Sequence, residues 1–170
     1  LDHNPRIRFP HPERANPWGI VATGGNLSPG ILLSAYEQGI FPWYEEEPIL
    51  WFSPDPRFVL FLDRFRIGTR FLRTLRNRPA EVTFDRDFDE VIGRCRTARR
   101  RGEGTWITAD MYDAYRRLHR LGYTHSVEVR RDGRLIGGLY GVGFGSFFAG
   151  ESMFSDERDA SKAPGRWRAA

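Results

Sequence analysis

The sequence contains almost no cysteine or lysine and no long apolar run. Cys95 is the sole cysteine among 170 residues, so no disulfide can form within the chain, and a reducing compartment is the simpler expectation. No stretch approaches the roughly 20 consecutive apolar residues that a membrane-spanning helix requires, so no membrane association is expected. The chain is nevertheless 40% hydrophobic and 14% aromatic, which is enough apolar material for one folded domain or two small ones.

The positive charge resides almost entirely in arginine. Of 26 basic residues, 25 are Arg and one, Lys162, is Lys, and the formal net charge is +4. The spacing of Arg70, Arg73 and Arg76 places three guanidinium groups near one face of a predicted helix. Such a face attracts polyanions, with RNA as the first candidate, although a solvated helix face or the base composition of the genome explains the same pattern.

Residues 1–57 are predicted to form a small N-terminal domain that is rich in Pro and Gly. Ser28 suits an N-cap, Pro29 suits the first position of a helix, and Gly39 suits its end, so one helix is expected between them. Residues 41–43 are expected to form a loop. Residues 50–57 read as a short extended segment broken by two prolines.

Residues 58–170 are predicted to place helices first and an antiparallel meander after them, which is the α+β class. An Asp132-Gly133 pair predicts a tight hairpin within the meander. The expected strands cover residues 58–62, 82–84, 126–130, 135–142 and 146–153. The expected helices cover residues 69–77, the apolar stripe Phe88, Val91, Ile92 and Cys95, and the segment that follows Thr108 and ends at Gly122.

Glu151 is the leading candidate for a functional residue. Its neighbours Phe147, Phe148 and Met153 are large and apolar, and on an alternating strand Glu151 faces the same side as Met153. A carboxylate in apolar surroundings needs a positive or hydrogen-bonding partner, which makes Glu151 a candidate to receive an amine. The alternative is a strand-end glutamate in water or paired with a nearby arginine.

No motif points to metal ions or to a nucleophilic side chain. Ser152 and Ser155 lack the context of a nucleophile elbow. His119 and His125 are six residues apart, which is the wrong spacing for a zinc-binding pair on one helix. Cys95 lies in the apolar stripe of a predicted helix and is expected in the core. No metal is therefore expected.

A hairpin sheet of this kind also suggests an N-acetyltransferase that uses acetyl-CoA. That chemistry needs a Gly-rich loop whose amides hold a pyrophosphate at the start of a helix. Residues 155–160, which follow the last predicted strand, contain no glycine and three acidic residues. This segment disfavours CoA, and no cofactor is expected.

Seven motifs occur in a fixed order along the chain. They are Gly24-Gly-Asn-Leu-Ser-Pro29, Ala35-Tyr-Glu-Gln-Gly-Ile-Phe-Pro-Trp43, Leu50-Trp-Phe-Ser-Pro-Asp-Pro-Arg57, Gly104-Thr-Trp-Ile-Thr108, His125-Ser-Val-Glu128, Gly137-Gly-Leu-Tyr-Gly-Val142 and Gly150-Glu-Ser-Met-Phe-Ser155. Together they make the chain resemble the leucyl/phenylalanyl-tRNA–protein transferase family, from about Phe9 to Lys162.

This resemblance implies a small N-terminal domain on a C-terminal domain of N-acetyltransferase-like (GNAT-like) fold that uses no CoA. It implies a cytoplasmic, monomeric aminoacyltransferase that moves Leu or Phe, and less readily Met, from aminoacyl-tRNA to an N-terminal Arg or Lys of a protein. The product is then marked for degradation by the N-end rule. The Arg-rich helix would hold the tRNA acceptor stem by its phosphates.

The resemblance also assigns site residues. The substrate pocket of the family corresponds here to Trp43, Trp106, Leu139, Phe148 and Glu151, and Met153 joins them because it faces the same side as Glu151. Glu151 is expected in a supporting catalytic role, holding an amino group or a ribose hydroxyl near the ester. Leu139 stands where relatives often carry Met, and Phe52 stands where a second Trp is common; both changes are expected to preserve binding.

One segment departs from the family pattern. After Ala160-Ser-Lys162, family members continue with a helix and a strand that carries an Asp-x-Gln motif assigned to the peptide-transfer step. Here residues 163–170 read differently, and Pro164-Gly165 breaks the expected helix. The sequence therefore predicts a C-terminal domain that is truncated and a transferase activity that is absent or very weak. A relic that binds aminoacyl-tRNA without catalysis is the alternative function, and a CoA-dependent acetyltransferase is a less favoured one.

Overall fold

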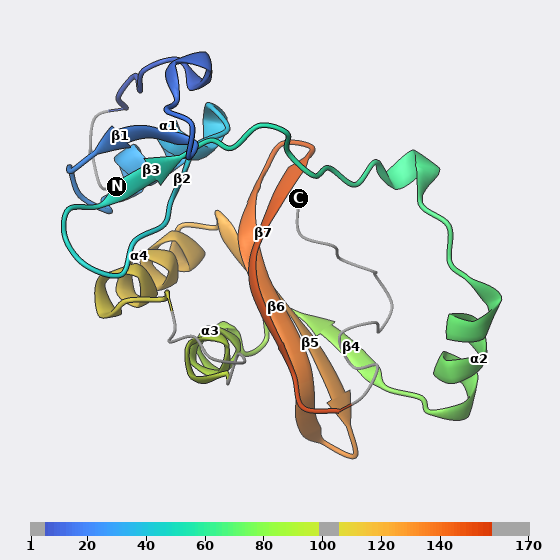
Figure 1. The fold of residues 1–170 in the computed structure, drawn as a ribbon. Coiled ribbons are helices and arrows are strands. Elements are labelled where there is room, and N and C mark those ends of the chain that lie inside the picture. Colours follow the sequence, from blue (N-terminus) through green and yellow to red (C-terminus); the bar gives the residue numbers. More distant parts are fainter. Residues whose placement is uncertain (1–5, 99–105, 158–170) are drawn as a thin grey trace. The chain divides into compact units, whose positions relative to one another are not determined.

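Helices and antiparallel sheets together build the described part of the chain, which is residues 6–98 and 106–157 of a computed structural model (Figure 1). The chain divides into two compact units. Unit 1 comprises Leu1–Arg57 and Arg100–Leu118, and unit 2 comprises Phe58–Arg99 and His119–Ala170. Residues 100–118, predicted to belong to the C-terminal domain, group instead with the N-terminal segment. The mixture of helix and antiparallel sheet confirms the α+β class.

Unit 1 contains a three-stranded antiparallel sheet in the order β1-β3-β2. Its strands are β1 (Ile20–Thr23), β2 (Phe41–Pro42) and β3 (Leu50–Phe52). The extended segment predicted at residues 50–57 is confirmed for its first three residues. The loop predicted at residues 41–43 is wrong for Phe41 and Pro42, because these two residues pair with Phe52 and Trp51 of β3. A short η1 turn (Pro12–Arg14) precedes this sheet.

The helix of unit 1 follows the predicted capping signals. Helix α1 (Pro29–Glu37) begins after Ser28, which has extended backbone angles, and Gly39 has a φ of 73° just beyond its end. Tyr36 of α1 is buried, and its hydroxyl lies 2.6 Å from the hydroxyl of Tyr115 in α4 (Ala109–Arg120). This hydrogen bond joins the two helices within unit 1.

Unit 2 is built on a four-stranded antiparallel sheet in the order β4-β5-β6-β7 (Figure 1). Its strands are β4 (Glu81–Phe84), β5 (Thr124–Arg131), β6 (Arg134–Phe144) and β7 (Phe147–Ser155). Asp132 and Gly133 have φ values of 51° and 75°, which is the conformation of a two-residue hairpin turn, so the predicted hairpin is confirmed.

Helix α3 (Phe88–Thr97) packs on one face of this sheet. All four residues of its predicted apolar stripe are buried, which confirms the stripe and the core position of Cys95. The helix approaches β6 closely at a glycine: a Cβ atom added to Gly138 would lie 3.1 Å from Val91 Cγ2 and 3.0 Å from Phe154 Cε1. One face of the sheet therefore belongs to the core.

The segment that enters unit 2 differs from the prediction. The strand expected at residues 58–62 is wrong: residues 58–61 are irregular and lead into a 3-10 turn, η2 (Leu62–Arg64). Phe58, Phe61 and Leu62 are exposed, so this apolar run lacks the buried side that an alternating strand needs. Helix α2 (Thr69–Asn77) follows with the predicted boundaries.

Candidate functional site

Glu151 occupies an irregularity in the pairing of β6 with β7. Tyr140 pairs with Ser152, and the next residue, Gly141, pairs with Gly150. Strand β7 therefore has one residue more than β6 in this interval, and that residue is Glu151. Such a β-bulge bends a strand and changes the direction of a side chain, and bulges are common beside functional sites.

Four of the predicted substrate residues share one face of the unit 2 sheet. Leu139 and Met153 are opposite each other on β6 and β7, and both are half-buried. Alternation back from Met153 keeps Glu151, also half-buried, on this side. Phe148 pairs with Gly143, and Gly143 is four residues after Leu139 on β6, so both pairs point to the same face of the sheet. This face is the one opposite to α3.

Glycines in β6 make room for the ring of Phe148. A Cβ atom added to Gly141 would lie 2.6 Å from Phe148 Cζ and 2.2 Å from the carbonyl oxygen of Ala149. The Phe148 ring therefore covers the backbone of Gly141. A side chain at position 141 would push Phe148 away from the sheet, so the position of this predicted pocket residue depends on the glycine.

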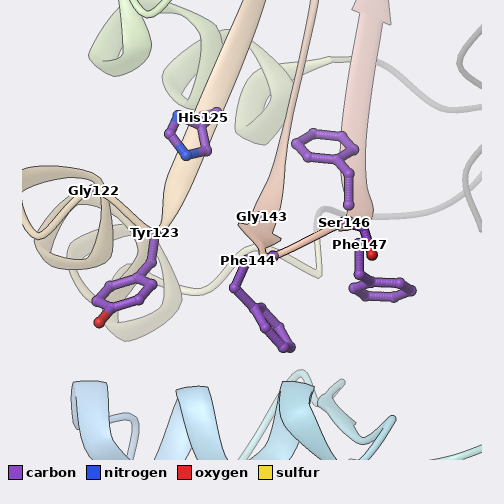
Figure 2. A pocket seen from close by; sticks show the side chains of 9 residues that line it. Gly122, Tyr123, His125, Gly143, Phe144, Ser146 and Phe147 are labelled. Atoms are coloured by element: carbon purple, nitrogen blue, oxygen red, sulfur yellow. The ribbon is translucent and has the colours of Figure 1, made fainter.

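A pocket of about 580 Å³ opens at the end of this sheet, beside Phe148. Figure 2 shows aromatic side chains and one imidazole around it, from the start of β5 and from the β6–β7 turn. Aromatic walls with a few polar groups suit a flat or apolar ligand. The lining residues are Gly122, Tyr123, His125, Gly143, Phe144, Gly145, Ser146, Phe147 and Phe148.

The imidazole in this pocket is held by a carboxylate that the sequence did not single out. His125 Nδ1 lies 2.8 Å from Asp85 Oδ2, and the backbone N–H of Ser126 donates to Asp85 Oδ1 at 2.8 Å. Asp85 has a φ of 55°, a left-handed conformation that Asp tolerates better than most residues. The turn after β4 thus presents both carboxylate oxygens to β5.

Glu128 is a fully buried carboxylate in the same strand. Its oxygens accept hydrogen bonds from the hydroxyls of Thr83 and Ser126, each at 2.6 Å. A buried charge is stable only with such partners. Glu128 therefore joins β4 to β5 from the core side.

The two predicted tryptophans lie in unit 1. Trp43 follows β2, is 51% exposed, and its ring centroid lies 5.5 Å from that of Phe52. Trp106 is half-buried and precedes α4. The segments that carry them are linked, because the hydroxyls of Tyr44 and Thr108 lie 3.4 Å apart. Burial raises the pKa of the Tyr44 phenol above its ordinary value.

The structure therefore divides the predicted pocket between its two units. Leu139, Phe148, Glu151 and Met153 come together on one sheet face, whereas Trp43 and Trp106 belong to unit 1. That all six bind one substrate stays a prediction. The Asp85–His125 pair has no sequence signature, because strand pairing joins residues 40 positions apart.

The predicted basic helix is present. Arg73 and Arg76 of α2 are exposed, while the side chain of Arg70 lies outside the described residues. The part of the chain that the structure describes holds no cluster of three or more His, Cys, Asp or Glu residues suited to a metal ion. Within the same residues, no helix combines the length and apolar character needed to span a membrane.

Unit 2 thus presents exposed arginines on α2 and, on its sheet, an apolar face that carries the half-buried carboxylate of Glu151.

Comparison with known proteins gives the family. Residues 59–164 match the family model for leucyl/phenylalanyl-tRNA protein transferase, and residues 25–55 match the model for the N-terminal domain of that protein. The chain belongs to the leucyl/phenylalanyl-tRNA–protein transferase family.

Curated relatives agree with this assignment. The chain is 55% identical over 157 residues to a leucyl/phenylalanyl-tRNA–protein transferase of Maridesulfovibrio salexigens. The aligned region covers 91% of this chain and 65% of the relative. It is 57% identical over 159 residues to the protein of that name from Syntrophus aciditrophicus, covering 92% of this chain and 66% of the relative. The chain thus spans slightly less than two thirds of the length of these relatives.

Proposed function

We propose that this protein transfers Leu or Phe, and less readily Met, from aminoacyl-tRNA to the N-terminal Arg or Lys of an acceptor protein. The observation that carries the proposal is the sheet face of unit 2, where Leu139, Phe148 and Met153 share one side with the bulged Glu151. Family membership supplies the reaction class. The modified N-terminus would mark the acceptor for degradation.

The proposed roles follow from side-chain chemistry. Leu139, Met153 and Phe148 offer apolar surface to the side chain of the transferred amino acid. Glu151 holds the amino group of that amino acid, because a half-buried carboxylate binds an ammonium strongly. Trp43 and Trp106 are assigned to the same ligand by the family resemblance.

The chemistry needs positioning more than activation. The ester of an aminoacyl-tRNA is already reactive, so the enzyme must hold an amine against the carbonyl carbon and manage one proton. No cofactor is required for these steps. We further propose that unit 2 has a GNAT-like fold, which the antiparallel order β4-β5-β6-β7 and the packing of α3 on one face support.

The proposal also covers the partners and the compartment. Arg70, Arg73 and Arg76 of α2 bind tRNA phosphates, without reading sequence. The protein acts as a monomer in the cytoplasm, where charged tRNA is available.

The test of the activity is transfer of labelled Leu from Leu-tRNA to a peptide with N-terminal Arg. Transfer to this peptide, and none to a peptide with N-terminal Gly, would support the proposal over the absent or very weak activity that residues 163–170 predict. Glu151→Gln keeps the size of the side chain but removes the charge, so it should weaken binding of a 3′-aminoacylamino-adenosine. Binding of tRNA with no transfer would contradict the proposed activity and favour a binding-only protein, whereas a thermal shift with acetyl-CoA would favour an acetyltransferase.

The tRNA surface has its own test. The double variant Arg73→Glu, Arg76→Glu should weaken tRNA binding and lower the slope of log affinity against log salt by about 2, because two phosphate contacts are lost. The matched control is Arg117→Glu, Arg120→Glu, which reverses two exposed arginines on α4. Equal salt slopes for both double variants would place the tRNA elsewhere.

A further inference from the structure

The sheet of unit 1 exposes aromatic rings on one of its faces. Phe41 of β2 and Phe52 of β3 are directly opposite each other, so their side chains point to the same face. The backbone N–H of Trp43 donates to the Leu50 carbonyl at 2.9 Å, which continues this pairing and places Trp43 on the same face. Phe41 and Phe52 are half-buried, and Trp43 is exposed. The outward face of an antiparallel sheet is usually polar, so three rings there indicate a binding surface.

The opposite face of this sheet belongs to the core of unit 1. Trp51 and Pro42 are buried there, and the Trp51 ring centroid lies 4.9 Å from that of Phe9. The indole N–H of Trp51 donates to the Gly24 carbonyl at 2.8 Å. The core therefore takes the alternate residues of β2 and β3, which leaves the rings of the outward face available to a ligand.

The outward rings form a continuous series that ends in a cation. The Phe52 ring centroid lies 5.5 Å from that of Trp43 and 6.3 Å from that of Phe41. The planes of the two phenyl rings differ by 26°. The guanidinium carbon of Arg57 lies 4.9 Å from the centroid of the Phe41 ring. We call this series the aromatic row; its members, in spatial order, are Trp43, Phe52, Phe41 and Arg57.

The charge of Arg57 is available to an anion. Its Nη1 donates to the Gly39 carbonyl, which holds the guanidinium beside the Phe41 ring. Among the residues that the structure describes, no carboxylate forms an ion pair with Arg57. A guanidinium on an aromatic face offers a flat surface to a nucleobase and N–H donors to a phosphate.

The two ends of the aromatic row carry opposite charges. Residues 45–47, three exposed glutamates, follow shortly after Trp43, whereas Arg57 lies at the other end. Phosphates are attracted to Arg57 and repelled by the glutamates, and the ammonium of an aminoacyl group has the reverse preference. These charges predict the direction of a bound RNA strand, with its aminoacylated 3′ end at Trp43 and its preceding phosphates toward Arg57.

We propose that the aromatic row binds the unpaired nucleotides that precede the terminal adenosine of the tRNA. Their bases stack on Phe52 and Phe41, and Arg57 binds a phosphate between them. This inference rests on the proposed function, which makes tRNA the substrate. Stacking on exposed rings suits single-stranded RNA, because every unpaired base has a free π-face, whereas the bases of a duplex are already stacked on each other. The aromatic row thus binds the single-stranded end, and α2 binds phosphates of the stem.

The test compares two tRNAs that both lack the terminal adenosine. One ends in the two cytidines that precede it, and the other lacks these cytidines as well. The ratio of the two Kd values reports the two cytidines alone, because contacts to the stem are the same in both. The unaltered protein should bind the longer tRNA at least about fivefold more tightly, since stacking on an aromatic side chain contributes about 5- to 150-fold per base.

Variants of the aromatic row should change this ratio in a defined order. Phe52→Leu keeps an apolar side chain but removes the flat ring, so it should lower the ratio toward 1. Phe52→Trp offers a larger π-face and should raise the ratio, which a merely structural role for the ring does not predict. Arg57→Gln should lower the slope of log affinity against log salt for the longer tRNA by about 1. The matched control, Trp18→Leu, removes a ring of unit 1 that is 77% exposed and lies outside the aromatic row, so the ratio should stay unchanged.

Equal ratios in Phe52→Leu and the unaltered protein would overturn the inference, and so would a ratio of 1 in the unaltered protein. If Phe52→Leu does not fold, Phe41→Leu supplies the same comparison. Dimerisation that either variant abolishes, with the ratio unchanged, would also overturn the inference and assign the aromatic row to a second copy of the chain. These measurements need no transfer activity, so absence of Leu transfer together with the expected ratios would contradict the proposed function and leave the RNA site in place.

Discussion

Replacing Gly141 with alanine should destabilise unit 2 and move the ring of Phe148 away from the sheet. The new methyl group would lie 2.2 Å from the carbonyl oxygen of Ala149 and 2.6 Å from Phe148 Cζ. The ring can rotate away, but the carbonyl belongs to the backbone of β7 and moves only with the strand. Overpacking of this kind costs about 1–3 kcal/mol, and the reduced freedom of the unfolded chain offsets about 0.4–1 kcal/mol of it.

The expected net loss is therefore about 1–2 kcal/mol in the free energy of unfolding, or a fall in Tm of about 2–8 °C. Gly93→Ala is the matched control, because its Cβ would meet no atom within 4 Å and it lies inside α3. This control should raise stability by up to about 1 kcal/mol through helix propensity. Urea unfolding of both variants measures the difference.

The same pair of variants tests the pocket. Gly141→Ala should weaken binding of a Phe-bearing aminoacyl-adenosine analogue, since Phe148 is displaced, whereas Gly93→Ala should bind it normally. If Gly141→Ala were as stable as the unaltered protein and bound the analogue equally well, the close approach of Phe148 and β7 to Gly141 would be refuted.

Three further changes test other parts of the molecule. Trp106→Ala should weaken binding of the same analogue by about 3 kcal/mol, measured by calorimetry, and an unchanged affinity would remove Trp106 from the site. Glu128→Gln should cost about 1–3 kcal/mol in urea unfolding, because the amide nitrogen cannot accept the hydrogen bond that one of the Thr83 and Ser126 hydroxyls now donates. Burial raises the pKa of Tyr44, so the stability that its neutral phenol contributes is present below about pH 10 and is lost as the pH rises through the pKa of the folded state. Tyr44→Phe should reduce this alkaline loss of stability, which unfolding measured at a series of pH values would show. An equal loss in both proteins would contradict the prediction.

Short sequence patterns correctly predicted the elements that depend on residues within one segment. The buried stripe of α3 follows from an i, i+3, i+4, i+7 pattern, and the β5–β6 hairpin follows from Asp132-Gly133. The predicted strand at residues 58–62 failed because an apolar run becomes a strand only when a partner strand is available. Strand β2 was missed for the converse reason, since its two residues are held by pairing with β3.

The candidate site shows the same division. Glu151 and Phe148 stand out in the sequence as a carboxylate among aromatic residues, and the family motifs name them. The bulge at Glu151 does not stand out, because it arises from a mismatch of register between two strands. The alternating pattern within β7 alone contains no sign of it.

By itself, the sequence determined the α+β class, the apolar and aromatic character of the pocket, the arginine helix and the family. These properties depend on residue type and on spacing within one segment. The tertiary structure alone decided that Asp85 pairs with His125, that Glu128 joins β4 to β5 from the core, and that the ring of Phe148 lies against Gly141 beside the bulge. Each of these depends on which residues of different strands become neighbours, and that pairing is fixed by register and by packing against α3, not by any one segment.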